Sequence, residues 1–389
     1  MERIRAIENT LKLTTVISSQ IGYLLVIAHS GRMLAQAAMC SGFKVLVIDL
    51  FADVDTQQYA ADFRKTESLA WGDLSSLVED FLALYPITHV LYGSGFECYP
   101  ESLVQLQRQL TVCGNTSEVF ARVQDKRGFF AAMASFSIPY PEVVFSKPQI
   151  NDCWLLKPLQ GQGGVGIRHF QVDALDDGNC YWQKYQAGVA HSMLFLADGN
   201  QVEVVGFNRQ WAADLGEAQP FAFAGIINHA ELSVNQRALL GRWVVQLSQF
   251  FGLRGLNSLD FIVDAEALWV LEINPRIPAS MQLYGEDLMR RHIAACAGEL
   301  QVMPPFAGRY CAYQIVYAPD DVVIPENFCW PAECVDLPEA GVICRKGQPI
   351  CSIIADYTQP DAVLSQLARV QQSIFNQLHR GFYPHGIPS

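Results

Sequence analysis

The hydrophobic and polar pattern near the start of the chain predicts a strand, a turn, a helix and a second strand. An apolar run, Tyr23–Ala28, ends at the polar turn His29-Ser30-Gly31, and a helical stretch, Arg32–Cys40, follows. Lys44–Asp49 then has the length and composition of a buried strand. This order predicts a parallel sheet, so we expect a Rossmann-like domain over residues 1–115. The turn lacks the G-x-G-x-x-G fingerprint, which argues against a dinucleotide site.

The pattern changes near residue 116, where a second unit begins. Ser117 to about Phe136 reads as one helix containing Asp125 and Lys126. Alternating residues predict strands at 142–145, 153–157 and 166–172. We therefore expect a mixed domain over residues 116–300, with a lid subdomain at about 150–190.

After about residue 300 the strands become short. Pro and Gly interrupt them, as in Ile343–Ile354, and an amphipathic helix is predicted over Pro360–Leu378. We expect a small β-rich region with a final helix over residues 301–389. The predicted fold class of the whole chain is α/β (α+β).

The stretch Leu256–Arg276 predicts a hairpin that turns near residues 264–267. The alternation pairs three apolar residues on each strand into one face: Leu259 with Ile273, Phe261 with Leu271 and Val263 with Trp269. On the other face Asp260 then lies opposite Glu272, with Asn274 beside it. Facing carboxylates repel each other unless a cation lies between them, and two carboxylates with an amide oxygen suit Mg²⁺. Because replacing Glu272 by Gln would relieve this repulsion, we expect that change to leave stability equal or slightly higher.

One lysine precedes a glycine-rich stretch. Lys157 ends a predicted strand, and Gly161, Gly163, Gly164 and Gly166 follow. Glycine permits backbone N–H groups to approach phosphate oxygens closely, although a plain glycine-rich hairpin would read the same way. The segment Cys180–Gly188 is compatible with a plain hairpin or with a hinge that holds an adenine edge.

Composition limits the function classes. Half of the 389 residues are hydrophobic and 17% are charged, which is typical of a globular chain. A net charge of −12 argues against a general nucleic-acid binder. Eleven scattered cysteines without C-x-x-C spacing indicate reduced thiols, and the apolar run at residues 21–28 is too short to span a membrane. We expect a cytoplasmic protein without nucleic-acid or membrane partners.

Taken together, these motifs resemble the ATP-grasp superfamily over about residues 20–300. The matching positions are, in order, Asp125-Lys126, Lys157-Pro158, the glycine loop, the hinge Gln183–Gln186, the Gly188 to Ser192 step and Glu272-Ile-Asn-Pro-Arg276. The chain is most similar to a branch of predicted ATP-dependent carboligases related to biotin carboxylase, near the tyramine–glutamate ligases. The C-terminal segment resembles the β-rich end of biotin-carboxylase-like chains.

The resemblance implies a role for each motif. Lys126 and Lys157 would contact the α- and β-phosphates of ATP, and the glycine loop would cover the β- and γ-phosphates. Lys184, Tyr185 and Gln186 would line the adenine. Asp260, Glu272 and Asn274 would hold Mg²⁺, with Mn²⁺ as a substitute, and Arg276 would steady the transferred phosphoryl group. The family usually has a glutamate before the hinge aromatic residue, where this chain has Lys184.

The implied activity is that of an ATP-dependent carboxylate–amine ligase that forms an acyl phosphate, with a role in cofactor biosynthesis. Arg276 and Lys157 would be catalytic, and a small amino-acid-like carboxylate and an amine would bind near Arg32, Asp53 and Ser280. A homodimer is compatible with this reading. Carboxylation through carboxyphosphate, a non-catalytic nucleotide sensor and a nicotinamide oxidoreductase are the alternatives.

Overall fold

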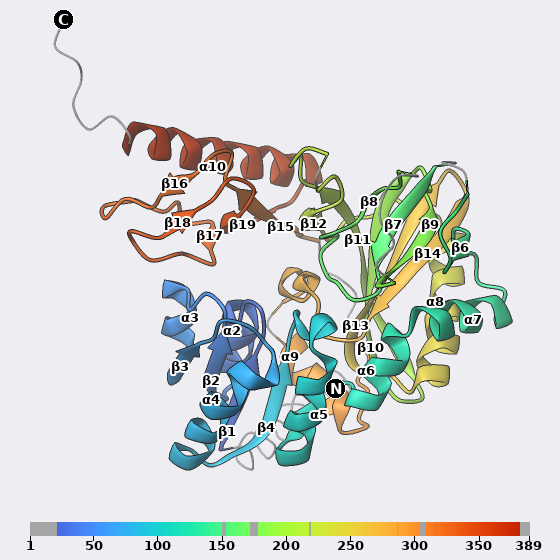
Figure 1. The fold of residues 1–389 in the computed structure, drawn as a ribbon, viewed down its shortest axis with the longest axis horizontal. Helices are drawn as coiled ribbons and strands as arrows, with labels where there is room; N and C mark the ends of the chain where they lie inside the picture. The colour runs from blue at the N-terminus through green and yellow to red at the C-terminus, as the bar shows by residue number, and fades with distance from the viewer. Residues whose placement is uncertain are drawn as a thin grey trace, which may run out of the picture.

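A computed structural model describes residues 22–149, 153–171, 178–217, 219–285, 287–303 and 308–381. It has a parallel sheet near the N-terminus, a small antiparallel sheet and one long antiparallel sheet (Figure 1). Among the helices of these residues, none has the length and apolar character needed to cross a bilayer.

The N-terminal sheet is parallel, with the strand order β3-β2-β1-β4-β5. The predicted elements at residues 23–49 form almost as expected, because their apolar runs are fully buried between two helical layers. One face packs against α2 and α9, and the other against α4 and α5. The elements are β1 (Tyr23–Ile27), α2 (Arg32–Cys40), β2 (Lys44–Asp49), α3 (Val54–Tyr59), β3 (Asp62–Lys65), α4 (Trp71–Leu84), β4 (Ile87–Tyr92), η1 (Phe96–Cys98), α5 (Pro100–Gln109) and β5 (Thr111–Cys113).

The small antiparallel sheet has the order β6-β9-β7-β8 and lies over one end of the long sheet (Figure 1). All three predicted strands form, but two are only two residues long. The strands are β6 (Val143–Val144), β7 (Trp154–Pro158), β8 (Arg168–His169) and β9 (Cys180–Lys184).

The long sheet has the order β14-β13-β10-β11-β12-β15-β19-β17. It runs across residue 300 without interruption, because β12 pairs with β15 through Gly225↔Gln314 and its neighbours. Its strands are β10 (Val189–Asp198), β11 (Val202–Ala212), β12 (Phe223–Ile227), β13 (Arg254–Asp264), β14 (Ala267–Asn274), β15 (Tyr310–Tyr317), β17 (Cys334–Val335) and β19 (Pro349–Tyr357). The division of the chain at residues 115 and 300 stays a prediction.

Helices cover the long sheet in two places. One apolar cluster joins α7 and α8 to β10, β13 and β14, and a second joins α10 to β15 and β19. α8 begins at a capping box of Ser233 and Gln236 and ends at Gly252 in the left-handed conformation. The remaining elements are α6 (Ser117–Gln124), α7 (Lys126–Ser135), α8 (Val234–Phe251), η2 (Ala279–Leu283), α9 (Leu288–Cys296), β16 (Val322–Val323), β18 (Ile343–Cys344) and α10 (Pro360–Gly381).

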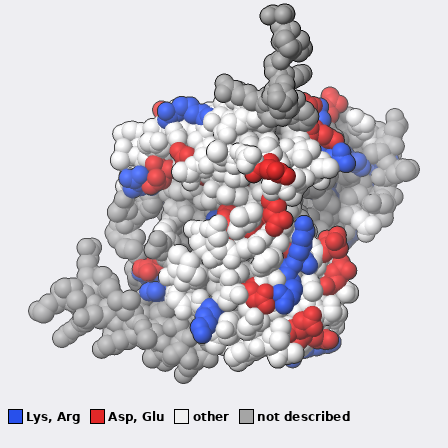
Figure 2. Space-filling model, turned by 90° about the vertical axis from the view of Figure 1, so that its left-hand side faces the viewer, with Lys and Arg blue, Asp and Glu red and all other residues white. Residues whose placement is uncertain are grey.

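One side of the molecule carries both signs of charge. Figure 2 shows acidic and basic side chains interspersed over the described residues of the face where α3 and the C-terminal strands lie. All eleven cysteines are free thiols.

Candidate functional site

The carboxylates of the β13–β14 hairpin lie opposite each other, as the sequence predicts. Asp260 pairs with Glu272 in register, and Leu259 pairs with Ile273. The other two predicted pairs are wrong, because a β-bulge after Asp260 leaves Leu271 without a register partner. Phe261 therefore faces Val270, and the buried residues of β14 become Leu268, Val270 and Ile273.

Lys126 reaches this pair from a helix start. The predicted single helix over 117–136 is wrong: it divides into α6 and α7 at Asp125, whose extended backbone stops the first helix. The Asp125 side chain accepts a hydrogen bond from the Arg127 N–H and caps α7. Lys126 is thus the first residue of α7, and its Nζ donates to Glu272 Oε2 at 3.0 Å.

The two carboxylates differ electrostatically. Burial and the charge of Glu272 raise the pKa of Asp260 to about 7. Burial also acts to raise the pKa of Glu272, but Lys126 and Lys157 outweigh it and lower that pKa. Burial lowers the pKa of Lys157, an effect that Glu272 opposes. The positive charges of Lys126 and Lys157 therefore stabilise the ionised form of Glu272 more than that of Asp260.

Two side-chain amides donate hydrogen bonds to Asp260. Asn274 Nδ2 donates to Asp260 Oδ2 at 3.0 Å and to Ser258 Oγ at 3.2 Å. Gln210 Nε2 donates to Asp260 Oδ1 at 3.4 Å. Nowhere in the described part of the chain do three His, Cys, Asp or Glu side chains gather as a metal site. The carboxylates of Asp260 and Glu272 suit Mg²⁺, which would share its shell with phosphate and water. Asn274 would offer its amide oxygen to such a cation only after its amide turned over, because Nδ2 faces Asp260 and Oδ1 accepts from Arg276.

Arg276 follows this hairpin and is held from the N-terminal sheet. Its Nε donates to Glu97 Oε1 at 2.7 Å, and its second terminal nitrogen donates to Asn274 Oδ1 at 3.4 Å. Glu97 is buried, and its other oxygen accepts from the Gly95 N–H at 2.8 Å. Sequence reasoning missed Glu97, because nothing in Gly93–Cys98 resembles a motif and its partner lies 179 residues away.

A buried amide network fixes the backbone beside Arg276. Asn115 Nδ2 donates to Asn257 Oδ1 at 2.7 Å and to the Pro275 carbonyl at 2.9 Å. Asn115 Oδ1 accepts from the Arg254 N–H at 2.7 Å, and the Tyr92 hydroxyl also donates to Pro275. The N-terminal sheet thereby sets the position of the Pro275-Arg276 step.

The glycine loop is docked on the start of β12 and on the residues just before it. The Phe223 N–H donates to the Gly163 carbonyl at 2.8 Å. A Cβ on Gly164 would lie 1.8 Å from the Phe221 carbonyl oxygen, so this position requires glycine. Gly163, Gly164 and Gly166 all have positive φ, whereas Gly161 has an ordinary one.

The lid strands present two different faces. Lys157 is buried, and its Nζ donates to Gln183 Oε1 at 3.1 Å. Lys184 faces the other way and lies over the Trp154 ring, 4.9 Å from its centroid. The predicted role of Lys184 at the adenine stays a prediction.

Beyond β9, three rings meet where the lid joins the long sheet. Tyr185 lies 5.7 Å from His169 and 6.4 Å from Phe221, and His169 lies 5.4 Å from Phe221. Gln186 is half-buried and donates to Asp264 at 3.2 Å. The pairing of His169 with Leu155 places His169 on the same face as Gln183. Phe221 lies in a loop, so no periodic pattern in the sequence points to it.

The three predicted substrate residues lie at the seam between the N-terminal sheet and the C-terminal strands. Arg32 is buried and donates to Asp336 Oδ1 at 2.8 Å and to Gln282 Oε1 at 3.0 Å. It therefore serves as an ion-pair partner rather than as an open cation. Ser280 is buried with no hydrogen-bond partner among the described residues. Burial, followed by Asp336, raises the pKa of Asp53 to about 8.

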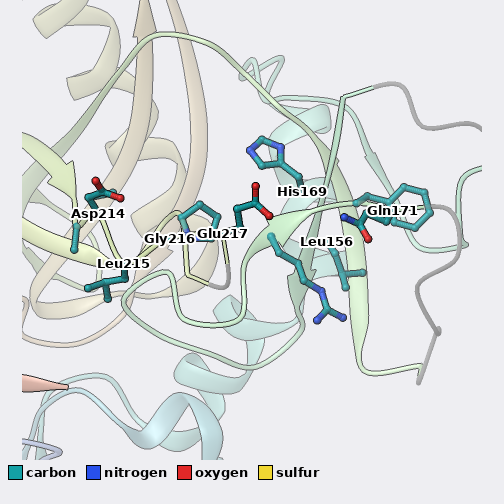
Figure 3. Close-up of a pocket in the computed structure, with 12 residues that line it drawn as sticks. Leu156, His169, Gln171, Asp214, Leu215, Gly216 and Glu217 are labelled. Carbon is teal, nitrogen blue, oxygen red and sulfur yellow. The ribbon is translucent and has the colours of Figure 1, made fainter. Parts of the chain in front are cut away.

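A separate cavity of about 1080 Å³ opens beside β8 (Figure 3). Its walls include β8, which contributes His169, and the loop after β11, which contributes Glu217. None of the lysines or carboxylates described above lines it, so the site rests on their geometry and not on this cavity.

Comparison with known families identifies this arrangement. Residues 123–280 match the family model of the ATP-grasp domain. The chain contains an ATP-grasp domain. The matched residues include both lysines, the glycine loop, the carboxylate hairpin and Arg276. This finding confirms the predicted family and fold class.

Solved structures of low sequence identity share the fold of this chain. The biotin carboxylase domain of Hydrogenobacter thermophilus 2-oxoglutarate carboxylase, a dimer with MgADP, ADP and bicarbonate, has a TM-score of 0.71 at 16% identity, covering 90% of this chain and 89% of that one. Campylobacter jejuni biotin carboxylase has a TM-score of 0.70 at 14% identity, with 92% and 91% covered. Staphylococcus aureus N5-carboxyaminoimidazole synthetase has a TM-score of 0.65 at 14% identity, with 92% and 97% covered.

A curated relative matches part of the sequence. The arginine-specific large chain of carbamoyl phosphate synthase from Halalkalibacterium halodurans is 22% identical over 275 residues, which are 65% of this chain and 26% of that protein. The chain thus spans about a quarter of the length of this relative.

Proposed function

We propose that the protein is an ATP- and Mg²⁺-dependent ligase that joins a small carboxylate to an amine through an acyl phosphate. One observation carries the proposal: Lys126, Lys157 and the Asp260–Glu272 pair form a single charge cluster, and Arg276 lies next to it through Asn274. Phosphoryl transfer needs positioned charge rather than a covalent nucleophile.

Each group has a proposed role in binding. Lys126 and Lys157 neutralise the α- and β-phosphates, and the glycine loop covers the β- and γ-phosphates. Asp260, Glu272 and Asn274 hold Mg²⁺, which neutralises charge between the phosphates. The raised pKa of Asp260 supports this role, because a nearby cation would favour its ionised form.

The proposed reaction has two displacements. A carboxylate oxygen of the substrate attacks the γ-phosphorus, the bond to the bridging oxygen breaks, and ADP leaves. The amine then attacks the acyl carbon, loses a proton, and inorganic phosphate leaves. Arg276 suits the acyl phosphate because its guanidinium binds oxyanions in a planar fork. Docking of the glycine loop on Phe221–Phe223 would exclude water from the acyl phosphate.

We place the amine near Asp53 and the seam residues Arg32 and Ser280. Asp53 is buried beside Asp49, Asp55 and Asp336, so an ammonium group would offset their repulsion. On this proposal Asp53→Asn raises the KM for the amine at least tenfold and leaves ATP affinity unchanged, which steady-state kinetics would measure.

The decisive experiment offers acids and amines in pairs and follows ADP release together with mass detection of a new amide. Amide formation that needs both partners supports the proposal. ATP consumption that depends on bicarbonate alone would replace it with the carboxyphosphate reaction, which the likeness to biotin carboxylase favours as the second candidate.

We also propose a homodimer and a cytoplasmic location. The first is supported by the fold shared with a domain dimer, and the second by eleven free thiols. Light scattering and cell fractionation would test them.

A further inference from the structure

The Gln183 side chain is buried with one hydrogen-bond donor left unpaired within the described part of the chain. It is 1% exposed, and its Oε1 accepts the bond from Lys157. Its Nε2 has no partner among the described residues. Exchanging the positions of Oε1 and Nε2 would be unfavourable, because the Lys157 ammonium can only donate and would then face the NH₂ group of Gln183. A buried donor without an acceptor is unfavourable, so a ligand is the natural source of one.

The position of Gln183 shows which part of a nucleotide would supply that acceptor. In β9, Trp182 and Lys184 point to the outer face, whereas Gln183 points inward with Tyr181. On one side Gln183 contacts Lys157, the proposed phosphate-binding lysine. On the other side, two residues further along the chain, Tyr185 belongs to the ring cluster with His169 and Phe221. Aromatic rings offer flat faces and edges on which a nucleobase can pack.

We infer that Gln183 contacts the six-position of the purine and that its own contribution to binding favours an oxo group over an amino group, so that it weakens the discrimination of the site against 6-oxo purines while ATP remains the nucleotide of the proposed reaction. This inference rests on the proposed nucleotide site. An oxo group accepts from Nε2 while Oε1 keeps Lys157. An amino group brings a second donor to Nε2, and accepting it would require the amide to turn away from Lys157.

The test compares ATP with ITP, which carries a 6-oxo group. Kd values are measured by calorimetry with Mg²⁺ for the full chain and for Gln183→Glu. The variant offers only acceptors and keeps a partner for Lys157. We therefore expect it to raise the ratio of the ITP Kd to the ATP Kd at least tenfold, because its carboxylate accepts from an amino group and repels an oxo group. The two nucleotides also differ at N1, which carries a proton in ITP and none in ATP. The result is therefore read from how the Kd ratio changes between the wild-type protein and the variant, and not from the ratio in one protein.

A second variant and the outcomes complete the design. Gln183→Met removes both donor and acceptor, and we expect it to raise the same Kd ratio, but by less than Gln183→Glu does. Melting curves check that both variants fold. If both nucleotides bind and the ratio is the same in all three proteins, the inference is overturned. If neither nucleotide binds the wild-type protein, the proposed function fails instead.

Discussion

Asp260 and Glu272 show how two adjacent carboxyl groups acquire opposite properties. The raised pKa of Asp260, about 7 against an ordinary 3.8, means that the folded protein holds this proton more tightly than the unfolded chain does. The resulting stabilisation is fully present below about pH 4 and is lost as the pH rises through 7.

Asp260→Asn keeps this position neutral at every pH. We expect the nucleotide-free variant to be more stable than wild type by roughly 1 to 3 kcal/mol at pH 8, with the difference shrinking toward zero near pH 4. Urea denaturation at several pH values measures this. Equal stability at pH 8 would contradict the raised pKa, and ATP turnover should be lost whatever the stability.

For Glu272 the structure reverses the expectation from the sequence that Gln relieves repulsion. Lys126 and Lys157 lower the pKa of Glu272, so its ionised form is stabilising above about pH 4.5 and that stabilisation is lost as the pH falls through the lowered value. Its side chain is 36% exposed, which screens the effect. We expect Glu272→Gln to destabilise the protein by about 1 kcal/mol at pH 7, measured against Asp260→Asn as the matched control.

At the scale of elements, the glycine loop offers a pair of matched substitutions. Gly163 and Gly164 both have positive φ, 60° and 74°. A Cβ at Gly163 meets nothing within 4 Å, whereas at Gly164 it collides with the Phe221 carbonyl. We expect Gly164→Ala to reduce kcat at least tenfold and Gly163→Ala about threefold or less, because only the former breaks the docking. Equal losses in steady-state assays would mean that backbone strain alone matters.

The same scale shows where sequence reasoning succeeds. Strict apolar runs predict β1, α2 and β2 almost to the residue, and the hairpin turn is also predicted. The bulge at Leu271 is not, because a skipped residue leaves the alternation of each strand intact when read alone. The inward facing of Gln183 is not predictable from the sequence either, because it depends on the register that pairs Lys157 with Tyr181 across β7 and β9.

Contacts between distant segments set the limit of prediction for the whole molecule. Glu97 is recognisable only beside Arg276, and Arg32 looks like an open anion site until Asp336 is placed against it. Each pair spans well over a hundred residues, and no local pattern encodes such a distance.

Asn115 joins the N-terminal sheet to the ATP-grasp domain. It is fully buried and makes three strong hydrogen bonds, to Asn257, Pro275 and Arg254. We expect Asn115→Ala to cost roughly 2 to 4 kcal/mol, because it leaves these buried groups unpaired. Chemical denaturation measures that loss, and a kcat reduced more than the ATP affinity would indicate that Arg276 has moved.

The continuous pairing of β12 with β15 has a consequence for the integrity of the chain. If the segment after residue 300 were removed, β12 would become an edge strand with a row of unpaired N–H and C=O groups. Such an edge invites a second copy to add its own strand. The C-terminal segment therefore also protects the ATP-grasp domain from aggregation, and a cleavage near residue 300 would yield fragments prone to self-association rather than an independent domain.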